Sequence, residues 1–348
     1  MSEKLGVGIL GAGWVSTQHI DAFKRNPHTK VVAISSRKLS SCEARAKEAG
    51  LADVKIYTEY QKMLEQEDLD VVSICTPQHL HAGEVIQAAE AGKHILVEKP
   101  AATSLEDLKA MRDAVRRAKV KTLVSFVLRW NPLFETIKSM IADDFLGNVY
   151  YVETDYQSHV GDWWSGWEWA QKKKIAVDSY LVAGCHALDA LRWFAGRNRY
   201  EAANIVEVYS YAGGYRKGRD IDWYGFEVML VKFGNGILGK VSSNFDCVQP
   251  YNFQISIFGD KGTMKENKVW SSRFPGQTGW VQIPTVLPDS VEVTHHPFRE
   301  EIDHFVSCIL KNEESHCNLE DAVNTHEAIF AAMISQTSGE RVKLPLIK

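Results

Sequence analysis

A glycine-rich segment near the N-terminus constrains the fold more than any other feature of the sequence. Residues 5–10 (LGVGIL) form an apolar run that stops at Gly11, and residues 14–25 have the apolar spacing of a helix. Gly11 permits a tight turn, and Gly13 lets the backbone approach a pyrophosphate at the N-terminus of the helix. Ser16 stands where a third glycine is common, and it is small enough for close packing. This arrangement is typical of a dinucleotide-binding turn.

Strand and helix patterns alternate through the segment that follows. Further strands are predicted at residues 31–34, 70–75, 94–97 and 122–127, with helical patterns between them. Strands that are separated by helices need crossover connections, so we expect a parallel sheet with helices on both faces. We therefore assign residues 1–126 to a doubly wound α/β Rossmann domain that binds a dinucleotide.

The pattern changes in the second part of the chain. Residues 149–156 alternate as in a half-buried strand, and residues 226–233 and 237–245 flank an Asn-Gly turn. Long strands without intervening helices favour antiparallel pairing. We expect residues 127–348 to form an α+β domain with a large, mostly antiparallel open sheet.

Composition excludes several classes of protein. The 348 residues include 40 Lys and Arg against 44 Asp and Glu, a formal net charge of −4, whereas a nucleic-acid or acidic-membrane binder would carry a basic excess. No apolar run approaches the ~20 residues of a membrane helix, and we see no apolar signal core. Six scattered cysteines without a CxxC pair predict reduced thiols in a cytoplasmic protein, and the histidines lack metal-ligand spacing. We therefore expect no nucleic acid, membrane or metal partner.

The end of the second predicted strand bears on the choice of cofactor. An acid about 20 residues after the glycines would bind the ribose 2′-OH of NAD. This chain reads Ser-Ser-Arg-Lys at positions 35–38, with no acid. Ser36 can donate to a 2′-phosphate and Arg37 can pair with it, which leans toward NADP. NAD stays possible, because Ser36 can also bond a 2′-OH.

A series of short motifs follows along nearly the whole chain. They are Gly11-Ala12-Gly13, Thr76-Pro77 with His81, residues 91–94 leading into Glu98-Lys99-Pro100, Arg129 with Asn131-Pro132, residues 184–189, and residues 258–263. In this order and spacing the chain resembles the Gfo/Idh/MocA oxidoreductases (glucose–fructose oxidoreductase, inositol dehydrogenase and rhizopine-catabolism proteins). The resemblance implies NAD(P)-dependent redox chemistry on a sugar or polyol, and a C-terminal domain for substrate binding and oligomerisation. Many members form dimers or tetramers, so a homo-oligomer is expected.

The expected cofactor site combines the glycine-rich turn with the ends of the later strands. Its predicted members are Gly11, Ala12, Gly13, Trp14, Val15, Ser36, Arg37, Thr76, Pro77, His81, Glu98, Lys99 and Arg129. As an alternative to cofactor binding, Arg129 could have a purely structural role, in an ion pair between the two domains.

Lys99 and His186 are the candidate catalytic residues. Oxidation of an alcohol needs hydride transfer to nicotinamide and removal of the hydroxyl proton. Lys99 follows a strand at the edge where open α/β sheets bind ligands, so it can steer the hydroxyl and act as base. Histidine titrates near neutral pH, which suits proton transfer at His186. The family often pairs this histidine with an aspartate four residues earlier, where this chain has Val182; Asp189 and Asp178 are possible substitutes.

An aromatic stretch carries four tryptophans, Trp163, Trp164, Trp167 and Trp169. Aromatic faces suit the apolar faces of sugars, so we expect one or two of them to touch substrate or cofactor and the others to be structural. The predicted substrate site comprises Arg129, Gln157, His159, Trp163, Trp164, Asp178, His186 and Asp189.

Three functions are compatible with these patterns. The leading one is an NAD(P)-dependent oxidoreductase acting on a ring hydroxyl of a sugar, polyol or glycoside, in its most concrete form at C3 of a glucoside. The second is a redox-cycling NAD-dependent glycosidase or lyase, in which transient oxidation acidifies a neighbouring C–H. The third is a non-catalytic dinucleotide-binding regulator, which Val182 keeps open and the retention of Lys99 and His186 disfavours.

Overall fold

The computed structural model describes residues 4–159, 161, 166–214, 221–288 and 296–348. The chain divides into two compact units, one of Met1–Val127 with Pro297–Ala322 and the other of Leu128–His296 with Val323–Lys348. The sequence-based boundary assigned all of residues 127–348 to one domain, and the structure differs for Pro297–Ala322. This segment returns to the first unit because its Phe298 ring packs on His19, with ring centroids 5.1 Å apart.

The first unit is built on a parallel sheet, which in the described residues has six strands in the order β3-β2-β1-β4-β5-β6. The strands are β1 Leu5–Leu10, β2 Thr29–Ser35, β3 Lys55–Tyr57, β4 Val71–Ile74, β5 His94–Val97 and β6 Thr122–Val124. The helices are α1 Ser16–Arg25, α2 Leu39–Glu48, α3 Tyr60–Leu64, α4 His81–Glu90, α5 Leu105–Ala118 and α10 Phe298–Lys311. The order reverses between β1 and β4, which is where open α/β sheets bind ligands. The predicted doubly wound fold is confirmed.

The second unit is built on a large mixed sheet, with nine strands in the described residues in the order β14-β13-β12-β11-β7-β10-β9-β8-β15. The strands are β7 Val149–Gln157, β8 Ile205–Gly213, β9 Phe226–Phe233, β10 Leu238–Asn244, β11 Asn252–Gly259, β12 Gly262–Lys265, β13 Lys268–Ser271, β14 Val281–Gln282 and β15 Val342–Lys343. β7 and β10 pair in parallel, and the other pairs are antiparallel. The predicted mostly antiparallel sheet is confirmed.

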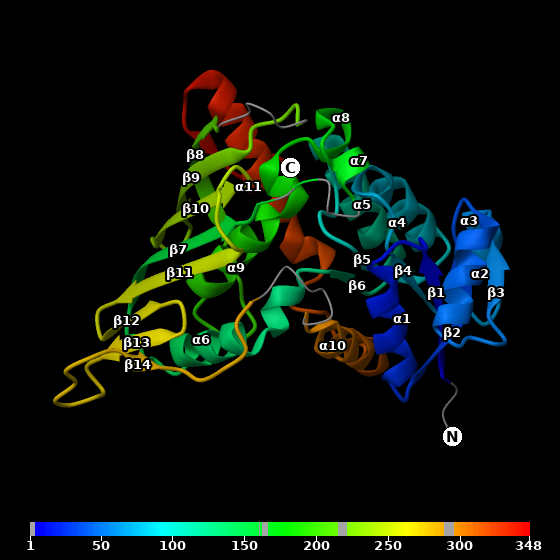
Figure 1. Ribbon diagram of the computed structural model, residues 1–348, viewed down its shortest axis with the longest axis horizontal. Helices are drawn as coiled ribbons and strands as arrows, with labels where there is room; N and C mark the ends of the chain where they lie inside the picture. The colour runs from blue at the N-terminus through cyan, green and yellow to red at the C-terminus, as the bar shows by residue number, and fades with distance from the viewer. Residues whose placement is uncertain (1–3, 160, 162–165, 215–220, 289–295) are drawn as a thin grey trace. The chain divides into compact units, whose positions relative to one another are not determined.

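Helices cover one face of the large sheet. Figure 1 shows α9 (Cys185–Ala195) and α11 (Leu319–Ser338) on the same side of it. Further helices of the second part of the chain are α6 Pro132–Ala142, α7 Trp167–Ala170 and α8 Lys173–Ala176, with a π-helical turn at Tyr180–Gly184. Along β9, Met229 and Val231 are buried and Leu230 between them is 57% exposed, so the strand alternates between a covered and an open face.

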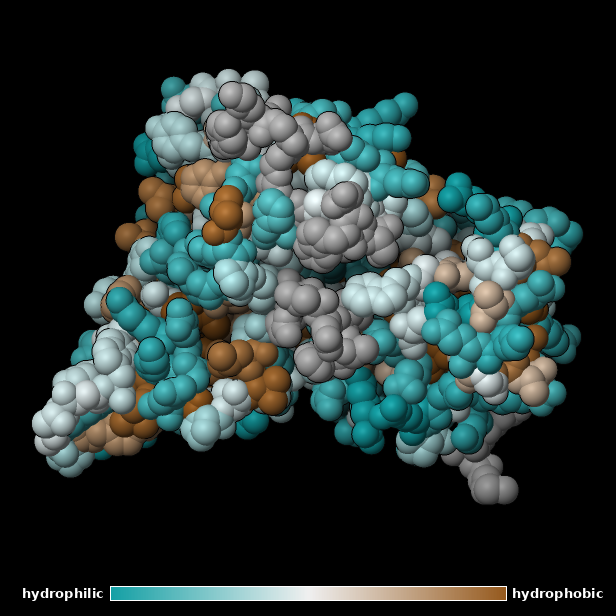
Figure 2. All heavy atoms as spheres, viewed as in Figure 1, coloured by the Kyte–Doolittle hydropathy of each residue, from teal (hydrophilic) through white to brown (hydrophobic). Residues whose placement is uncertain are grey.

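The open face of the sheet carries large apolar side chains. Tyr211 on β8, Leu230 on β9 and Leu238 on β10 are each more than half exposed. Figure 2 shows brown patches among the teal surface of the part that carries this sheet. Within the described ranges, the chain has no helix with both the length and the apolar character needed to cross a membrane.

Candidate functional site

The turn after β1 has the geometry of a dinucleotide-binding loop. Gly11 has φ +100°, and a Cβ there would lie 2.7 Å from the carbonyl oxygen of Cys75, so only glycine fits. A Cβ at Gly13 would meet no described atom within 4 Å, which leaves open space beside the turn. α1 begins at Ser16 without a side-chain cap from the described residues, and the positive end of its dipole favours an anion beside the turn. These features fit a bound pyrophosphate.

Arg45 on α2 belongs to this turn, and the sequence analysis missed it. Its Nη2 donates to the carbonyl oxygens of Ala12 at 3.3 Å and Gly13 at 3.2 Å. These hydrogen bonds stabilise the turn and place a positively charged side chain next to it. No motif marks Arg45, because the contact joins residues that lie more than thirty positions apart.

The carboxyl end of β2 carries the residues that were expected to select the cofactor. Ser36 is half-buried and donates its backbone N–H to the carbonyl oxygen of Tyr57 at 3.2 Å. Arg37 is exposed. The two residues follow the strand directly and lie at the same edge of the sheet as the glycine-rich turn.

The turn after β4 is held by buried polar contacts. The Thr76 hydroxyl donates to the Glu84 carboxylate, and burial raises the pKa of Glu84 to about 7. The two ring nitrogens of His81 lie 2.8 Å from the carbonyl oxygens of Thr76 and Pro100, and burial lowers the pKa of His81. His81 therefore joins the Thr76-Pro77 turn to the segment after β5.

Glu98 and Lys99 lie at the carboxyl end of β5, the strand next to β4. Glu98 is 9% exposed and its Oε1 lies 3.0 Å from Nε2 of His19. Its Oε2 accepts the backbone N–H of Lys99 at 3.2 Å. Lys99 itself is half-buried. The structure thus brings the glycine-rich turn, Thr76 and Lys99 to one edge of the parallel sheet.

His186 lies in the second unit, as the second residue of α9. It is 7% exposed and follows the π-helical turn that contains Val182. The start of α9 is anchored because the Thr154 hydroxyl donates to the Ala187 carbonyl oxygen at 2.8 Å. A Cβ at Gly184 would lie 2.5 Å from Oγ of Ser243, so glycine is needed for the turn to approach β10.

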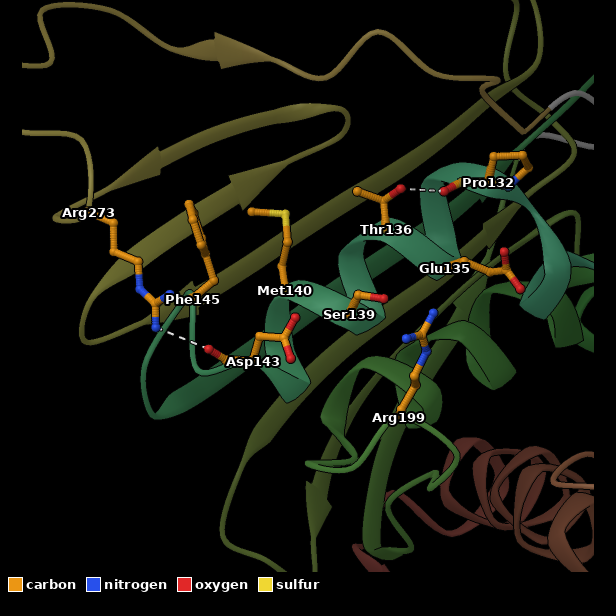
Figure 3. Close-up of a pocket in the computed structure, with 9 residues that line it drawn as sticks. All are labelled: Pro132, Glu135, Thr136, Ser139, Met140, Asp143, Phe145, Arg199 and Arg273. Atoms are coloured by element: carbon orange, nitrogen blue, oxygen red, sulfur yellow. Dashed lines mark hydrogen bonds between the residues drawn. The ribbon is translucent and has the colours of Figure 1, made fainter.

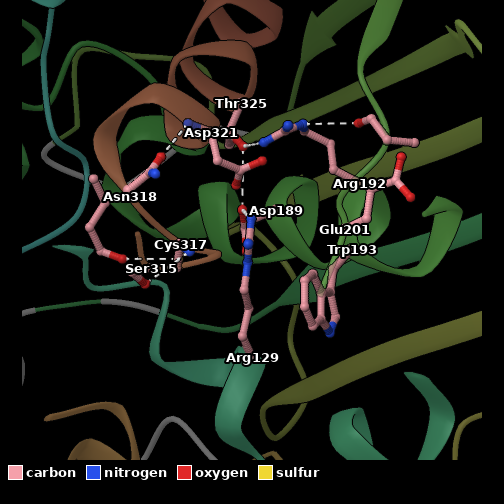
Figure 4. A network of polar contacts seen from close by, with 12 residues as sticks. Arg129, Asp189, Arg192, Trp193, Glu201, Ser315, Cys317, Asn318, Asp321 and Thr325 are labelled. Atoms are coloured by element: carbon pink, nitrogen blue, oxygen red, sulfur yellow. Dashed lines mark hydrogen bonds and ion pairs between the residues drawn. The ribbon is translucent and has the colours of Figure 1, made fainter. Parts of the chain in front are cut away.

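Asp189 is paired with Arg129 within the second unit. Nε and Nη2 of Arg129 donate to the two carboxylate oxygens at 2.7 and 2.6 Å, and both side chains are almost fully buried (Figure 4). The guanidinium also lies 4.8 Å from the ring centroid of Trp193. These contacts favour a structural role for both residues, and the ion pair joins segments of one unit rather than two.

Asp178 shapes the turn that leads to His186. Its Oδ1 accepts the backbone N–H of Leu181 at 2.7 Å, and its buried Oδ2 has no hydrogen bond to the described residues. Burial, and then the nearby Glu227 carboxylate, raise the pKa of Asp178 well above its usual range. Asp178 therefore favours the neutral acid.

The remaining predicted substrate residues are placed only in part. Gln157 ends β7 and accepts a hydrogen bond from Nε2 of Gln249 at 2.7 Å, and His159 is exposed two residues later. Trp163 and Trp164 lie outside the described residues. Trp167 and Trp169 are half-buried in α7.

A cavity of about 500 Å³ lies along α6, and none of the candidate site residues described above lines it (Figure 3). Its lining is Pro132, Glu135, Thr136, Ser139, Met140, Asp143, Phe145, Arg199 and Arg273. The two arginines are balanced by two acids, and Arg273 donates to the backbone carbonyls of Asp143 and Asp144. Among the described residues, no cluster of three or more His, Cys, Asp or Glu could hold a metal ion.

Comparison with known proteins identifies the family. Residues 5–126 match a family model described as an oxidoreductase family with an NAD-binding Rossmann fold, and residues 138–344 match the C-terminal alpha/beta domain of the Gfo/Idh/MocA oxidoreductases. The levoglucosan dehydrogenase of Pseudarthrobacter phenanthrenivorans is 28% identical over 294 residues, 76% of this chain and 74% of that protein. The D-glucoside 3-dehydrogenase of Escherichia coli is 28% identical over 212 residues, 60% of this chain and 58% of that protein.

A solved structure has the same fold along nearly its whole length. Levoglucosan dehydrogenase in complex with NADH superposes with a TM-score of 0.86 at 21% identity, covering 99% of this chain and 100% of the other. Both family models together span most of the sequence, which confirms the resemblance drawn from the motifs. The chain belongs to the Gfo/Idh/MocA oxidoreductase family.

Proposed function

We propose that this protein is an NAD(P)-dependent dehydrogenase that transfers hydride between nicotinamide and a ring hydroxyl of a sugar, polyol or glycoside. The observation that carries the proposal is the shared carboxyl edge of β1, β4 and β5. This edge combines an anion-binding turn with the basic side chain of Lys99. The carbohydrate class is supported by the named activities of the relatives, which act on levoglucosan and on D-glucosides.

The residues of the first unit suit a nicotinamide dinucleotide, which when bound supplies the carbon that accepts or gives the hydride. Gly11, Gly13 and the N-terminus of α1 would hold the pyrophosphate, next to the positive charge of Arg45. Ser36 and Arg37 would meet the ribose. The absence of an acid after β2 favours NADP over NAD in this proposal.

Two side chains would handle protons. Lys99 would hold the substrate hydroxyl and accept its proton, with its backbone fixed by the Glu98 carboxylate. His186, at the start of α9, would act as the second acid or base. The position that we propose for oxidation is C3 of a glucoside, which the activity named for one relative supports.

We further propose that the protein works in the cytoplasm as a homo-oligomer, a dimer or a tetramer. The free cysteines Cys42, Cys75, Cys185, Cys247, Cys308 and Cys317 suit a reducing compartment. The apolar side chains on the open face of the large sheet would be covered in the oligomer.

The test begins with the purified protein. It is denatured, any released nucleotide is identified by mass spectrometry, and absorbance at 340 nm is followed with NAD or NADP against a panel of sugars, polyols and glycosides. We expect steady formation of reduced cofactor with one compound, and a loss of about 100-fold or more in Lys99→Met.

Two results would contradict the proposal. Product formation without a net change at 340 nm, from a cofactor that stays bound, would indicate redox cycling in place. Bound nucleotide with no compound consumed would indicate a regulator.

A further inference from the structure

A buried polar cluster beside Lys99 ties three elements of the first unit together. His19 on α1 is completely buried, with Nδ1 2.8 Å from Oγ of Ser73 on β4 and Nε2 3.0 Å from Oε1 of Glu98 after β5. The other oxygen of Glu98 accepts the backbone N–H of Lys99. One hydrogen-bonded series therefore runs from β4 through α1 to the peptide of Lys99.

The His19–Glu98 contact has the geometry of an ion pair. Burial opposes charge on both groups, but Cys75 and Glu98 raise the pKa of His19 well above its usual range. His19 in turn lowers the pKa of Glu98 below its ordinary value, against the effect of burial. An imidazolium donates from both nitrogens, so it can form hydrogen bonds to Ser73 and Glu98 at the same time. The second bond fixes the Glu98 carboxylate between His19 and Lys99.

Four titratable side chains face this pair and act on its charges. They are Cys75 after β4, His81 on α4, Lys99 and Glu301 on α10. Glu301 is completely buried, and its Oε2 accepts a hydrogen bond from the Ser125 hydroxyl at 3.0 Å. Burial raises the pKa of Glu301 well above its usual range, which favours the neutral acid. The Phe298 ring, 5.1 Å away, covers the imidazole.

We propose that His19 is a positioning residue for Lys99, acting through the Glu98 carboxylate. The inference rests on the proposed function, in which Lys99 takes the substrate proton. A lysine side chain is long and flexible, so the position of its terminal nitrogen depends on how well its backbone is fixed. α1 also begins at the glycine-rich turn, so His19 links the backbone that faces the dinucleotide to the backbone that carries the base.

Two substitutions separate positioning from packing. In His19→Gln the amide nitrogen can occupy the place of Nε2 and donate to Glu98, whereas in His19→Asn the amide reaches only the place of Nδ1, near Ser73. We expect His19→Gln to keep kcat within about threefold and His19→Asn to lower it by about 10- to 100-fold, the usual range for residues that orient a reacting group. The KM for the cofactor should stay nearly constant in both.

Amide hydrogen exchange gives a readout that does not depend on turnover. The Lys99 amide donates to Glu98 in the wild type. We expect its exchange, followed by NMR without substrate, to be about tenfold faster in His19→Asn than in His19→Gln. Should His19→Asn fail to fold, Glu98→Gln provides the second measurement, with the same losses expected. Glu301→Gln is the matched control, because it keeps a neutral side chain in the same cluster and should turn over like the wild type.

Coupling to Lys99 completes the test. Because His19 acts through Lys99, the double variant Lys99→Met/His19→Asn should retain the same residual kcat as Lys99→Met alone. Equal kcat and equal Lys99 exchange in the Gln and Asn variants would overturn the inference, and so would a further tenfold loss in the double variant. Wild-type turnover in Lys99→Met would instead overturn the role of Lys99 in the proposed function.

Discussion

Two pairs of buried side chains lie within hydrogen-bond distance of each other, His19 with Glu98 and Arg129 with Asp189. Taking a charge out of water is costly, so each member of such a pair depends on the other. When one member is replaced by an uncharged residue, the fall in the free energy of unfolding therefore measures mainly the cost of leaving the other charge buried without a partner. Truncating one member of a structural pair should therefore lower stability, whereas truncating a residue that contacts a ligand should raise a KM.

The first prediction concerns Arg129. Arg129→Met leaves the Asp189 carboxylate buried and unmatched, so we expect the free energy of unfolding to fall by about 3–5 kcal/mol in urea titrations. Arg129→Met/Asp189→Leu should recover most of that loss, because no charge is left behind. A variant that raises the KM for cofactor or substrate and keeps wild-type stability would show that Arg129 contacts a ligand instead.

The second prediction concerns the cofactor. Ser36→Asp places a negative charge at the end of β2, and we expect the Kd for NADP to rise by about tenfold or more through repulsion of the 2′-phosphate, while the Kd for NAD changes little. Ser40→Asp, exposed on α2, is the matched control. Fluorescence titration measures both constants. Unchanged NADP affinity would mean that residue 36 does not face the ribose.

The third prediction concerns pH. Burial raises the pKa of Glu84 to about 7, so the folded state holds this proton more tightly than the unfolded state does. The stabilising effect is complete below the unfolded pKa of about 4.5 and is lost as the pH rises through about 7. Glu84→Gln should therefore gain about 3 kcal/mol relative to the wild type between pH 4.5 and 8. Glu90→Gln, exposed on the same helix, should show no such change, and parallel profiles for both variants would contradict the account.

At the scale of elements, one lysine fixes the end of the helix that carries His186. Lys138 on α6 is 1% exposed, and its Nζ donates to the carbonyl oxygens of Trp193, Gly196 and Glu201 at 2.5–2.7 Å. These carbonyls lie at the C-terminus of α9 and beyond it, where positive charge is favourable. Lys138 therefore ties α6 to the end of α9.

The fourth prediction follows from that contact. Lys138→Met removes the ammonium that donates to three carbonyl oxygens, so we expect a loss of about 3 kcal/mol in the free energy of unfolding. Lys109→Met on α5 is the control, because the Lys109 side chain is half exposed and pairs with Asp113 at the surface. A loss in Lys138→Met no larger than in the control would contradict this role.

The first unit was predictable because its signals are local. The glycine-rich turn and the alternation of strands and helices specify the parallel sheet within short stretches of chain. The second unit was not predictable in detail, because β7 pairs with β10 and β11, which follow it only after α9, β8 and β9. The return of Pro297–Ala322 to the first unit has no local signal either.

In the candidate site too, residues with a local sequence signal were predicted and residues without one were missed. Gly11, Gly13 and Lys99 were found from motifs, and the structure brings them to one edge of the sheet. The contacts of Arg45 and His19 were missed, because they join residues that are 32 to 79 positions apart in the sequence. Spacing rules act over one or two helical turns, so they carry no information about such pairs.

At the scale of the whole molecule, the fifth prediction concerns assembly. Leu230→Arg places a charge among the apolar side chains of the open sheet face, so we expect it to shift the proposed dimer or tetramer toward monomer in sedimentation velocity. Leu310→Arg, half exposed on α10, is the control and should leave the mass unchanged. An unchanged oligomer in Leu230→Arg, or a monomeric wild type, would show that this face is not an interface.

Transfer of isotope tests the central claim of hydride transfer most directly. The best substrate of the panel is prepared with deuterium on its reacting carbon and incubated with the protein and oxidised cofactor, and the mass of the reduced cofactor is measured. We predict a reduced cofactor one mass unit heavier than with the unlabelled substrate, formed about 100-fold or more slowly by Lys99→Met. Deuterium released into water, with no label on the nicotinamide, would contradict the account.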